Sequence, residues 1–278
     1  MITSLNSLLE DAYEKGYAVG AFNVYNYETI RAVVDAVKET KTPAIIAFGK
    51  KYLANMALKE VVNLVRTMTV DLDTDIVLHL DHCDDISIIH EAIEAGFTSV
   101  MYDGSKLSFE ENLENTRDVV KHAHKYAVSV EAELGALELG TNSNEDEGET
   151  IYTDPEEARK FTEKTGVDAL AVSIGTVHGL YKGKPKISVD RLREIRKSTT
   201  IPLVLHGGSG TPEKTIEACI KEGITKINVN TEISHSVVNM FKETIDHNDN
   251  VHFSQLGVKA REVAKDTIIK HMNRYKLV

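Results

Sequence analysis

The sequence has few of the features that mark an exported or membrane-bound protein. Its 278 residues include two cysteines, Cys83 and Cys219, so no disulfide framework is indicated and a reducing cytoplasm is the expected location. No apolar run approaches the length of a membrane-spanning helix. The N-terminus lacks the basic and then apolar pattern of a signal peptide. We therefore expect a cytoplasmic protein with no membrane partner.

Positive charge is also scarce. The 32 Lys and Arg residues stand against 43 Asp and Glu, for a net charge of −11. Nucleic acid is bound through a basic field over the phosphates, so this balance argues against a nucleic-acid partner. It does not exclude a small phosphorylated substrate, because one local pocket can be positive on an acidic protein. The length suits a single barrel of about 250 residues, although length alone also allows two domains.

Short apolar runs alternate with longer amphipathic stretches along the chain. The runs are nearly continuous Val, Ile, Leu and Ala, which is typical of strands buried on both faces. The predicted strands are Ala18–Phe22, Ala44–Phe48, Ile76–Leu80, Ser99–Tyr102, Val128–Ala132, Ala169–Ile174, Pro202–Leu205 and Lys226–Val229. Eight strands that alternate with helices predict an α/β fold, and we expect a single (β/α)8 TIM barrel over residues 1–278. An open, doubly wound sheet gives a similar pattern.

The predicted helices carry recognisable ends. Tyr27–Thr40 has apolar residues on one face, and Ile86–Ala95 is followed by Gly96, a typical C-cap. Pro155–Thr165 follows Asp154, which predicts an N-cap with proline at the first helical position.

One segment, 137–153, departs from this alternation. It is polar, acidic and long for a loop between a strand and a helix. Loops of this kind are either lids over an active site or disordered segments, and the pattern alone leaves both interpretations open.

Three histidines follow three predicted strands at corresponding positions. His82, His178 and His206 come after the third, sixth and seventh strands. A TIM barrel holds its active site at the C-terminal ends of its strands, so these imidazoles are expected to converge. One such histidine alone would more often be a hydrogen-bonded rim residue. Three together, with one open coordination position, are typical of catalytic zinc.

Asp81, beside the first of these histidines, is the strongest candidate for a general acid or base. A carboxylate there can exchange a proton with an oxygen of a metal-bound substrate. The alternative is a carboxylate that orients an imidazole, and the two roles look alike in sequence. His79 shares a strand face with Asp81, whereas His82 falls on the other face unless the strand has ended. We therefore expect His79 to support the site or to pack.

Two glycine- and hydroxyl-rich loops follow the seventh and eighth predicted strands. Barrels often hold phosphate at this place through backbone N–H groups and hydroxyls. A Gly-Gly-Ser-Gly run alone would be weak evidence, because turns use the same residues. The candidate phosphate-binding residues are Gly179, Lys182, Gly207, Gly208, Ser209, Asn230 and Thr231.

Polar residues also end other predicted strands. Asp103 and Glu133 are candidates for metal ligands or for partners of a ligand. Asn23 is a candidate to hydrogen-bond the substrate. Cys83 is expected to be a small packed residue rather than a fourth ligand.

Together these motifs resemble the class II, zinc-dependent fructose- and tagatose-bisphosphate aldolases. The similarity runs in order through nearly the whole chain. The matching stretches are Ala21–Asn26, His79–His82, Gly96–Ser105, Val130–Gly135, Thr165–Asp168, Leu170–Tyr181, Leu203–Gly210 and Lys226–Glu232.

The resemblance implies the reversible cleavage of a ketose 1,6-bisphosphate to glycerone phosphate and glyceraldehyde 3-phosphate. It implies His82, His178 and His206 as ligands of a zinc ion that polarises the C2 carbonyl as a Lewis acid. By the same resemblance, Asp81 exchanges a proton with the C4 hydroxyl. Asn228 stabilises the enediolate.

The resemblance also assigns roles around this centre. It implies that Asp103 and Glu133 lie near an alternative metal position, and that the glycine-rich loops hold the C1 phosphate and a monovalent cation, Na⁺ or K⁺. Family members are commonly homodimers or homotetramers, in which a neighbouring subunit supplies a cation for the second phosphate. Lys259 and Arg261 are candidates for the positively charged side chain that binds the second phosphate. The pattern around each of them is also typical of a solvated helix residue.

The sequence departs from the family pattern in three places. The family has a glycine-rich turn and Glu-Asp in a mobile loop that supplies the proton donor, where this chain has Ala136–Asn142. Gly49 replaces a common Ser or Thr, and Cys83 replaces a common Gly. The acidic candidates to replace the donor are Glu138, Glu145 and Glu147. A lyase acting on a different phosphorylated ketose and a non-catalytic phospho-sugar binder therefore remain alternative hypotheses.

Overall fold

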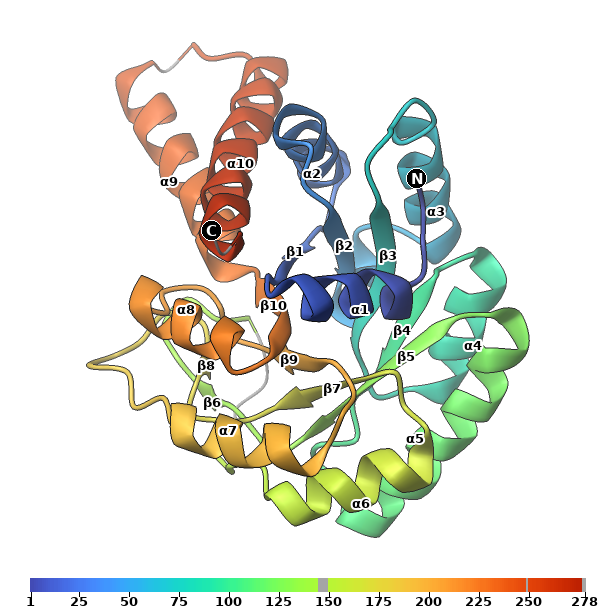
Figure 1. Cartoon of the computed structure of the whole chain (residues 1–278). Coiled ribbons are helices and arrows are strands. Elements are labelled where there is room, and N and C mark those ends of the chain that lie inside the picture. Colours follow the sequence, from blue (N-terminus) through green and yellow to red (C-terminus); the bar gives the residue numbers. More distant parts are fainter. Residues whose placement is uncertain (145–149, 249, 277–278) are drawn as a thin grey trace.

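The computed structural model describes residues 1–144, 150–248 and 250–276. Within them, eight parallel strands close into a barrel surrounded by helices (Figure 1). The strands follow one another around the barrel in chain order, as in a (β/α)8 TIM barrel, so the predicted fold is confirmed. The barrel strands are β1 (Val19–Asn23), β2 (Ala44–Gly49), β3 (Ile76–Cys83), β4 (Ser99–Tyr102), β5 (Ser129–Leu134), β7 (Ala169–Val172), β9 (Leu203–Leu205) and β10 (Ile224–Val229).

The helices lie mainly between consecutive strands. Three predicted helices have the predicted bounds, Gly96 ends α4 in a left-handed conformation, and the Asp154 carboxylate caps α6. Short 3-10 helices cover Lys50–Ala54 and His124–Tyr126. The α-helices are α1 (Leu5–Lys15), α2 (Tyr27–Thr40), α3 (Leu58–Met68), α4 (Ile86–Ala95), α5 (Phe109–Ala123), α6 (Pro155–Thr165), α7 (Val189–Ser198), α8 (Glu213–Lys221), α9 (Thr231–His247) and α10 (Phe253–Tyr275).

The barrel interior changes from apolar to polar along the strands. At the N-terminal end, Val19, Val77 and Ala169 pack together against α1, which lies across this end of the barrel (Figure 1). Successive residues of a strand point to opposite faces, so every second residue points inward. The inward positions further along β3 are therefore His79 and Asp81. The strand period thus carries polar side chains into the C-terminal half of the barrel, where the site lies.

A small second sheet joins the segment 137–153 to the barrel. β6 (Glu138–Leu139) pairs with β8 (Val177–His178). The backbone N–H of Gly140 donates to the carbonyl of His178 at 2.8 Å. The first part of the predicted lid is therefore attached to the segment that carries a candidate metal ligand. The predicted sixth strand was too long, since β7 ends at Val172.

Among the described residues, no helix is both long and apolar enough to cross a membrane. Cys83 and Cys219 are buried thiols, and Cys83 is a packed residue as expected.

Candidate active site

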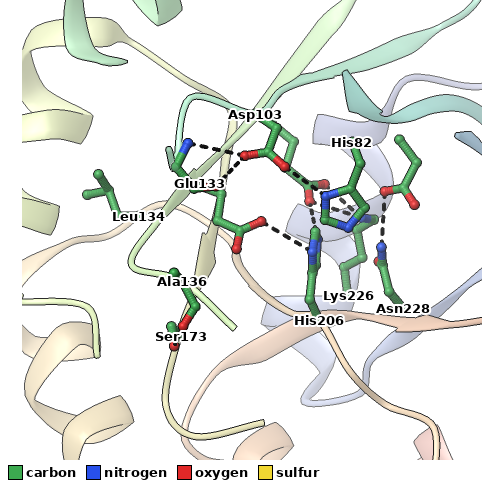
Figure 2. Close-up of polar contacts among 12 residues, drawn as sticks. His82, Asp103, Glu133, Leu134, Ala136, Ser173, His206, Lys226 and Asn228 are labelled. Atoms are coloured by element: carbon green, nitrogen blue, oxygen red, sulfur yellow. Dashed lines mark hydrogen bonds and ion pairs between the residues drawn. The ribbon is translucent and has the colours of Figure 1, made fainter. Parts of the chain in front are cut away.

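Three histidines meet at the C-terminal end of the barrel. Each of His82, His178 and His206 offers a ring nitrogen within 4.8 Å of the other two. The rings of His82 and His206 have centroids 4.5 Å apart, and Figure 2 shows the two side chains next to each other. The three histidines therefore lie together, as the sequence predicts.

His82 reaches this cluster through an unusual backbone conformation. Strand β3 continues to Cys83, so on a regular strand His82 would point away from the barrel interior. Its φ of 43° is left-handed, and the pairing of β3 with β4 shifts register between Leu80 and Cys83. Such a conformation costs about 1–3 kcal/mol and is retained mainly where the surroundings or a function require it. The local distortion turns the His82 ring into the site.

The ring nitrogens that face the centre suit a metal ion. Nε2 of His178 and Nδ1 of His206 are buried and have no hydrogen-bond partner among the described residues. Burial lowers the pKa of both rings, so they are neutral at physiological pH, the form that binds metal. Nε2 of His206 lies 3.0 Å from a Glu131 oxygen. A carboxylate behind one nitrogen leaves the other nitrogen available as a ligand.

Two carboxylates extend this cluster. Asp103 contacts Nδ1 of His82 at 3.0 Å, and Glu133 lies 3.4 Å from Nδ1 of His206. Burial and the nearby charge of Asp103 raise the pKa of Glu133 well above its usual value. His82, Asp103 and Glu133 form a second group whose potential ligand atoms lie within 4.8 Å of one another. The two groups share His82, so the residues fit a divalent metal in either of two adjacent positions.

Asp81 lies beside the histidines and is held by two amides. Nδ2 of Asn23 donates to one carboxylate oxygen at 2.8 Å, and Nδ2 of Asn228 donates to the other at 3.1 Å. Burial alone would raise the pKa of Asp81, but electrostatic interactions with His82 and Lys226 lower it below its usual value. Asp81 is therefore an oriented carboxylate whose lowered pKa favours the ionised form.

One cavity is lined by Asp81, by two of the three histidines and by most of the predicted phosphate-binding residues. Asn230 and Thr231 lie at the start of α9, where free backbone N–H groups favour anions. Gly207 has a φ of +74°, and a Cβ there would lie 2.3 Å from the carbonyl oxygen of Val177. Only glycine therefore allows this loop to approach so closely. The cavity is lined by Asn23, Asp81, His82, Ser143, His178, Gly179, Gly207, Ser209, Asn228, Asn230 and Thr231.

Outside the candidate metal groups, three further predicted residues do not line this cavity. Lys182 is exposed and lines a different cavity, together with Glu138. Gly208 is buried behind the loop, and its N–H donates to the carbonyl of Asn228 at 2.9 Å. Glu145 and Glu147, the other candidate proton donors, lie outside the described residues.

Two buried charged residues beneath the site were missed by the sequence reasoning. Glu131 and Lys226 are both fully buried, and Nζ of Lys226 lies 2.8 Å from Oε2 of Glu131. His79, also fully buried, lies 3.6 Å from the same oxygen and so supports the site as expected. Burial opposes ionisation of Glu131, but Lys226 lowers its pKa to about 2. The sequence does contain a signal for this pair, because Glu131 and Lys226 are charged residues within apolar runs that are predicted to be strands.

The fold and this cluster are typical of one class of protein, the (β/α)8-barrel enzymes that use a divalent metal. A family model described as class II fructose-bisphosphate aldolase matches residues 3–277. The chain belongs to that family and is accordingly a carbon–carbon lyase. Members of the family are generally metal-dependent and act on phosphorylated sugars.

Individual relatives agree with this assignment. The chain is 41% identical over 272 residues to a fructose-bisphosphate aldolase from Staphylococcus aureus strain Mu50, covering 96% of this chain and 94% of the relative. It is 41% identical over 246 residues to a sulfofructosephosphate aldolase from Alkalicoccus urumqiensis, covering 88% of this chain and 85% of that one. Among solved structures, the YdjI aldolase from Escherichia coli K12 superposes with a TM-score of 0.87 at 32% identity, covering 99% of this chain and 97% of that chain.

Proposed function

We propose that the protein catalyses the reversible, zinc-dependent cleavage of a ketose 1,6-bisphosphate, fructose or tagatose bisphosphate, to glycerone phosphate and glyceraldehyde 3-phosphate. The observation that carries this proposal is that two of the clustered histidines and Asp81 line one cavity together with the phosphate-type loops, and that the third histidine, His206, packs against His82. The similarity to the Staphylococcus aureus aldolase supports the choice of substrate.

Each group of residues has a separate role in the proposed reaction. His82, His178 and His206 would hold the zinc, which supplies Lewis-acid polarisation of the C2 carbonyl. Asp81 accepts the C4 hydroxyl proton as the C3–C4 bond breaks and the electron pair of that bond passes towards C2. The Asn228 amide, which already bonds Asp81, is placed to stabilise the resulting enediolate.

The remaining assignments concern the phosphate and the assembly. The loops at Gly207–Ser209 and Asn230–Thr231 bind the C1 phosphate together with Na⁺ or K⁺, and 137–153 acts as a mobile active-site loop. We further propose a cytoplasmic homodimer or homotetramer. In the single chain, Arg261 pairs with Asp35 at 2.6 Å on the outer surface between α10 and α2.

A different phosphorylated ketose is the second candidate substrate. Gly49 occupies the position where a hydroxyl is common in the family, and one relative is named a sulfofructosephosphate aldolase. Glu138 lines a cavity whose lining includes none of the three histidines, which is the observation that favours a non-catalytic phospho-sugar binder.

Purified, zinc-loaded protein is expected to release glycerone phosphate from fructose or tagatose bisphosphate. Chelation should abolish the release, and added zinc should restore it, because the polarised carbonyl depends on the metal. A coupled assay for glycerone phosphate over a panel of phosphorylated ketoses measures this. Protein with full zinc occupancy that cleaves neither bisphosphate would refute the proposal, and cleavage of another ketose alone would select the second candidate.

Replacing Asp81 with asparagine is expected to lower kcat by about 10²- to 10³-fold, because the amide cannot accept the C4 hydroxyl proton. The asparagine has nearly the same shape, so metal content should be unchanged. Steady-state kinetics and elemental analysis of the same samples check both statements. A loss of zinc in proportion to the loss of activity would instead assign Asp81 to orienting a metal ligand.

A further inference from the structure

The end of helix α10 carries a buried histidine that no step of the proposed reaction uses. His271 is fully buried in the last part of α10, where that helix lies beside the start of α9 (Figure 1). Its Nε2 lies 2.9 Å from Oε2 of Glu232, and its Nδ1 lies 3.1 Å from the hydroxyl of Tyr275. Burying a polar ring costs free energy unless its nitrogens have partners, so the role of His271 depends on these two contacts.

Tyr275 determines which nitrogen of this ring carries the proton. Burial raises the pKa of Tyr275, so its hydroxyl keeps its proton and can donate it to Nδ1 of His271. One nitrogen of a neutral imidazole accepts and the other carries the hydrogen, so Nε2 carries the proton that faces Glu232. Nζ of Lys270 lies 3.7 Å from the other oxygen of Glu232. Burial opposes ionisation of Glu232, but the contact with His271 lowers its pKa to about 2.

Glu232 in turn holds the glycine-rich loop that follows β9. The oxygen that contacts His271, Oε2, also accepts a hydrogen bond from the backbone N–H of Gly210 at 3.1 Å. The backbone N–H of Glu232 donates to Oγ of Ser209 at 3.2 Å. Because this oxygen accepts that bond, the hydroxyl proton of Ser209 stays available for an anion in the cavity that Ser209 lines. Glu232 does not belong to the described lining of this cavity, so it acts on a ligand there through the loop.

Two further contacts join the end of α10 to the same loop. Nη2 of Arg274 donates to the carbonyl oxygen of Thr211 at 3.4 Å. A Cβ at Gly208 would lie 3.3 Å from the hydroxyl of Tyr275, so this ring lies directly against the loop backbone. The end of α10 therefore contacts the loop directly at two residues and, through Glu232, at a third.

We infer that His271 is a positioning residue, which acts through Glu232 to hold loop 208–211 in the geometry that binds a phosphate. The inference rests on the proposed function, which places the C1 phosphate at this loop. Glu232 lies in the first turn of α9, where an uncompensated carboxylate would compete with a phosphate for the positive end of the helix. The contacts with His271 and Lys270 offset that negative charge. Donors that are held in place before the ligand arrives bind it without a further cost in ordering.

The test measures cleavage of fructose and tagatose 1,6-bisphosphate by the zinc-loaded protein. His271→Leu is expected to raise KM by about tenfold with unchanged zinc content and nearly unchanged kcat, because the phosphate is bound equally in the substrate and in the transition state. His271→Gln keeps an N–H donor and should retain most of the affinity.

Met272→Ala is the matched control for packing. Met272 is the next buried residue of α10, and its sulfur lies 3.5 Å from Oγ1 of Thr40 on α2. Its loss should lower the free energy of unfolding, as truncation of a buried side chain does, but leave KM unchanged. If Met272→Ala raises KM as much as His271→Leu does, or if His271→Leu lowers kcat without raising KM, the inference is overturned.

A double-mutant cycle tests whether His271 acts through Glu232. Glu232→Ala should also raise KM by about tenfold, and adding His271→Leu to it should have no further effect, because both changes break the same path to the loop. Multiplied effects in the double variant would show that the two residues act separately and would overturn the inference. Glu232 is partly exposed, so Glu232→Ala tests the same path if His271→Leu does not fold.

A binding measurement separates this inference from the proposed function. If the zinc-loaded protein cleaves neither bisphosphate, the proposed function fails, and calorimetry with glycerone phosphate then decides the role of His271. His271→Leu should bind glycerone phosphate about tenfold more weakly than the parent protein, and Met272→Ala should bind it as the parent does. No binding by the parent, or equal affinity of the parent and His271→Leu, overturns the inference.

Discussion

The His206→Ala variant is expected to lose its zinc and to cleave the ketose bisphosphate about 10³-fold more slowly, or not at all. A Lewis-acid metal stabilises the developing charge by several kcal/mol, and each 1.4 kcal/mol is a factor of ten in rate. His206 is 1% exposed, and its Nδ1 has no hydrogen-bond partner among the described residues, as expected of a nitrogen kept for a ligand. Elemental analysis and the glycerone phosphate assay measure the two effects.

The matched control is His247→Ala, which removes an exposed histidine near the end of α9. It should keep both zinc and activity. His206→Asn guards against a simple folding defect, because it retains a polar side chain near Glu131. Both His206 variants should unfold in urea close to the metal-free parent protein. A folded His206→Ala protein that binds zinc at parental affinity would show that the histidine cluster is not the metal centre.

The second large expected effect is on the free energy of unfolding rather than on the rate of the reaction. Lys226→Met should destabilise the metal-free protein by about 3–5 kcal/mol, because removing one member of a buried ion pair leaves an uncompensated charge. The partner, Glu131, is fully buried and loses its contact at 2.8 Å. Urea unfolding of the parent and the variant under identical conditions gives the difference.

The double variant Lys226→Met/Glu131→Gln provides the comparison. The glutamine is neutral and its carbonyl can still accept a hydrogen bond from His206, so most of the lost stability should return. If the single variant is as stable as the parent, or the double variant is no better than the single one, the pair does not stabilise the barrel as proposed.

The same pair predicts the direction of a pH effect. Lys226 lowers the pKa of Glu131 from 4.5 to about 2 against the opposing effect of burial. A carboxyl group whose pKa is lowered by folding contributes stability above its unfolded pKa and loses the contribution as the pH falls through the folded value. The stability difference between parent and Lys226→Met should therefore narrow as the pH falls from 4.5 towards 2. Urea midpoints at several pH values measure this.

Much of the site could be predicted because it follows from strand periodicity. In a TIM barrel the C-terminal ends of the strands share one rim, so polar residues that end apolar runs must lie near one another. His206 and Asp81 were located in this way, whereas the role of Asn228 came from the family resemblance. The same argument places Glu131 and Lys226 on inward positions, but a sequence does not show that two charges on different strands satisfy each other. Their pairing depends on a distance across the barrel.

The sequence by itself determined the alternation of strands and helices and the residue types at the strand ends, because these depend on local periodicity and on chain order. The tertiary structure decided that the strands close into a barrel rather than an open sheet. Only the tertiary structure decided how His82 enters the site, since a left-handed residue and a register shift leave no periodic signal. Only the tertiary structure shows that Lys182 lines a different cavity from the phosphate loops. Only it shows that Lys50 and Lys106 line the same cavity. Loop residues are positioned by contacts with distant segments, and those contacts exist only after the chain has folded.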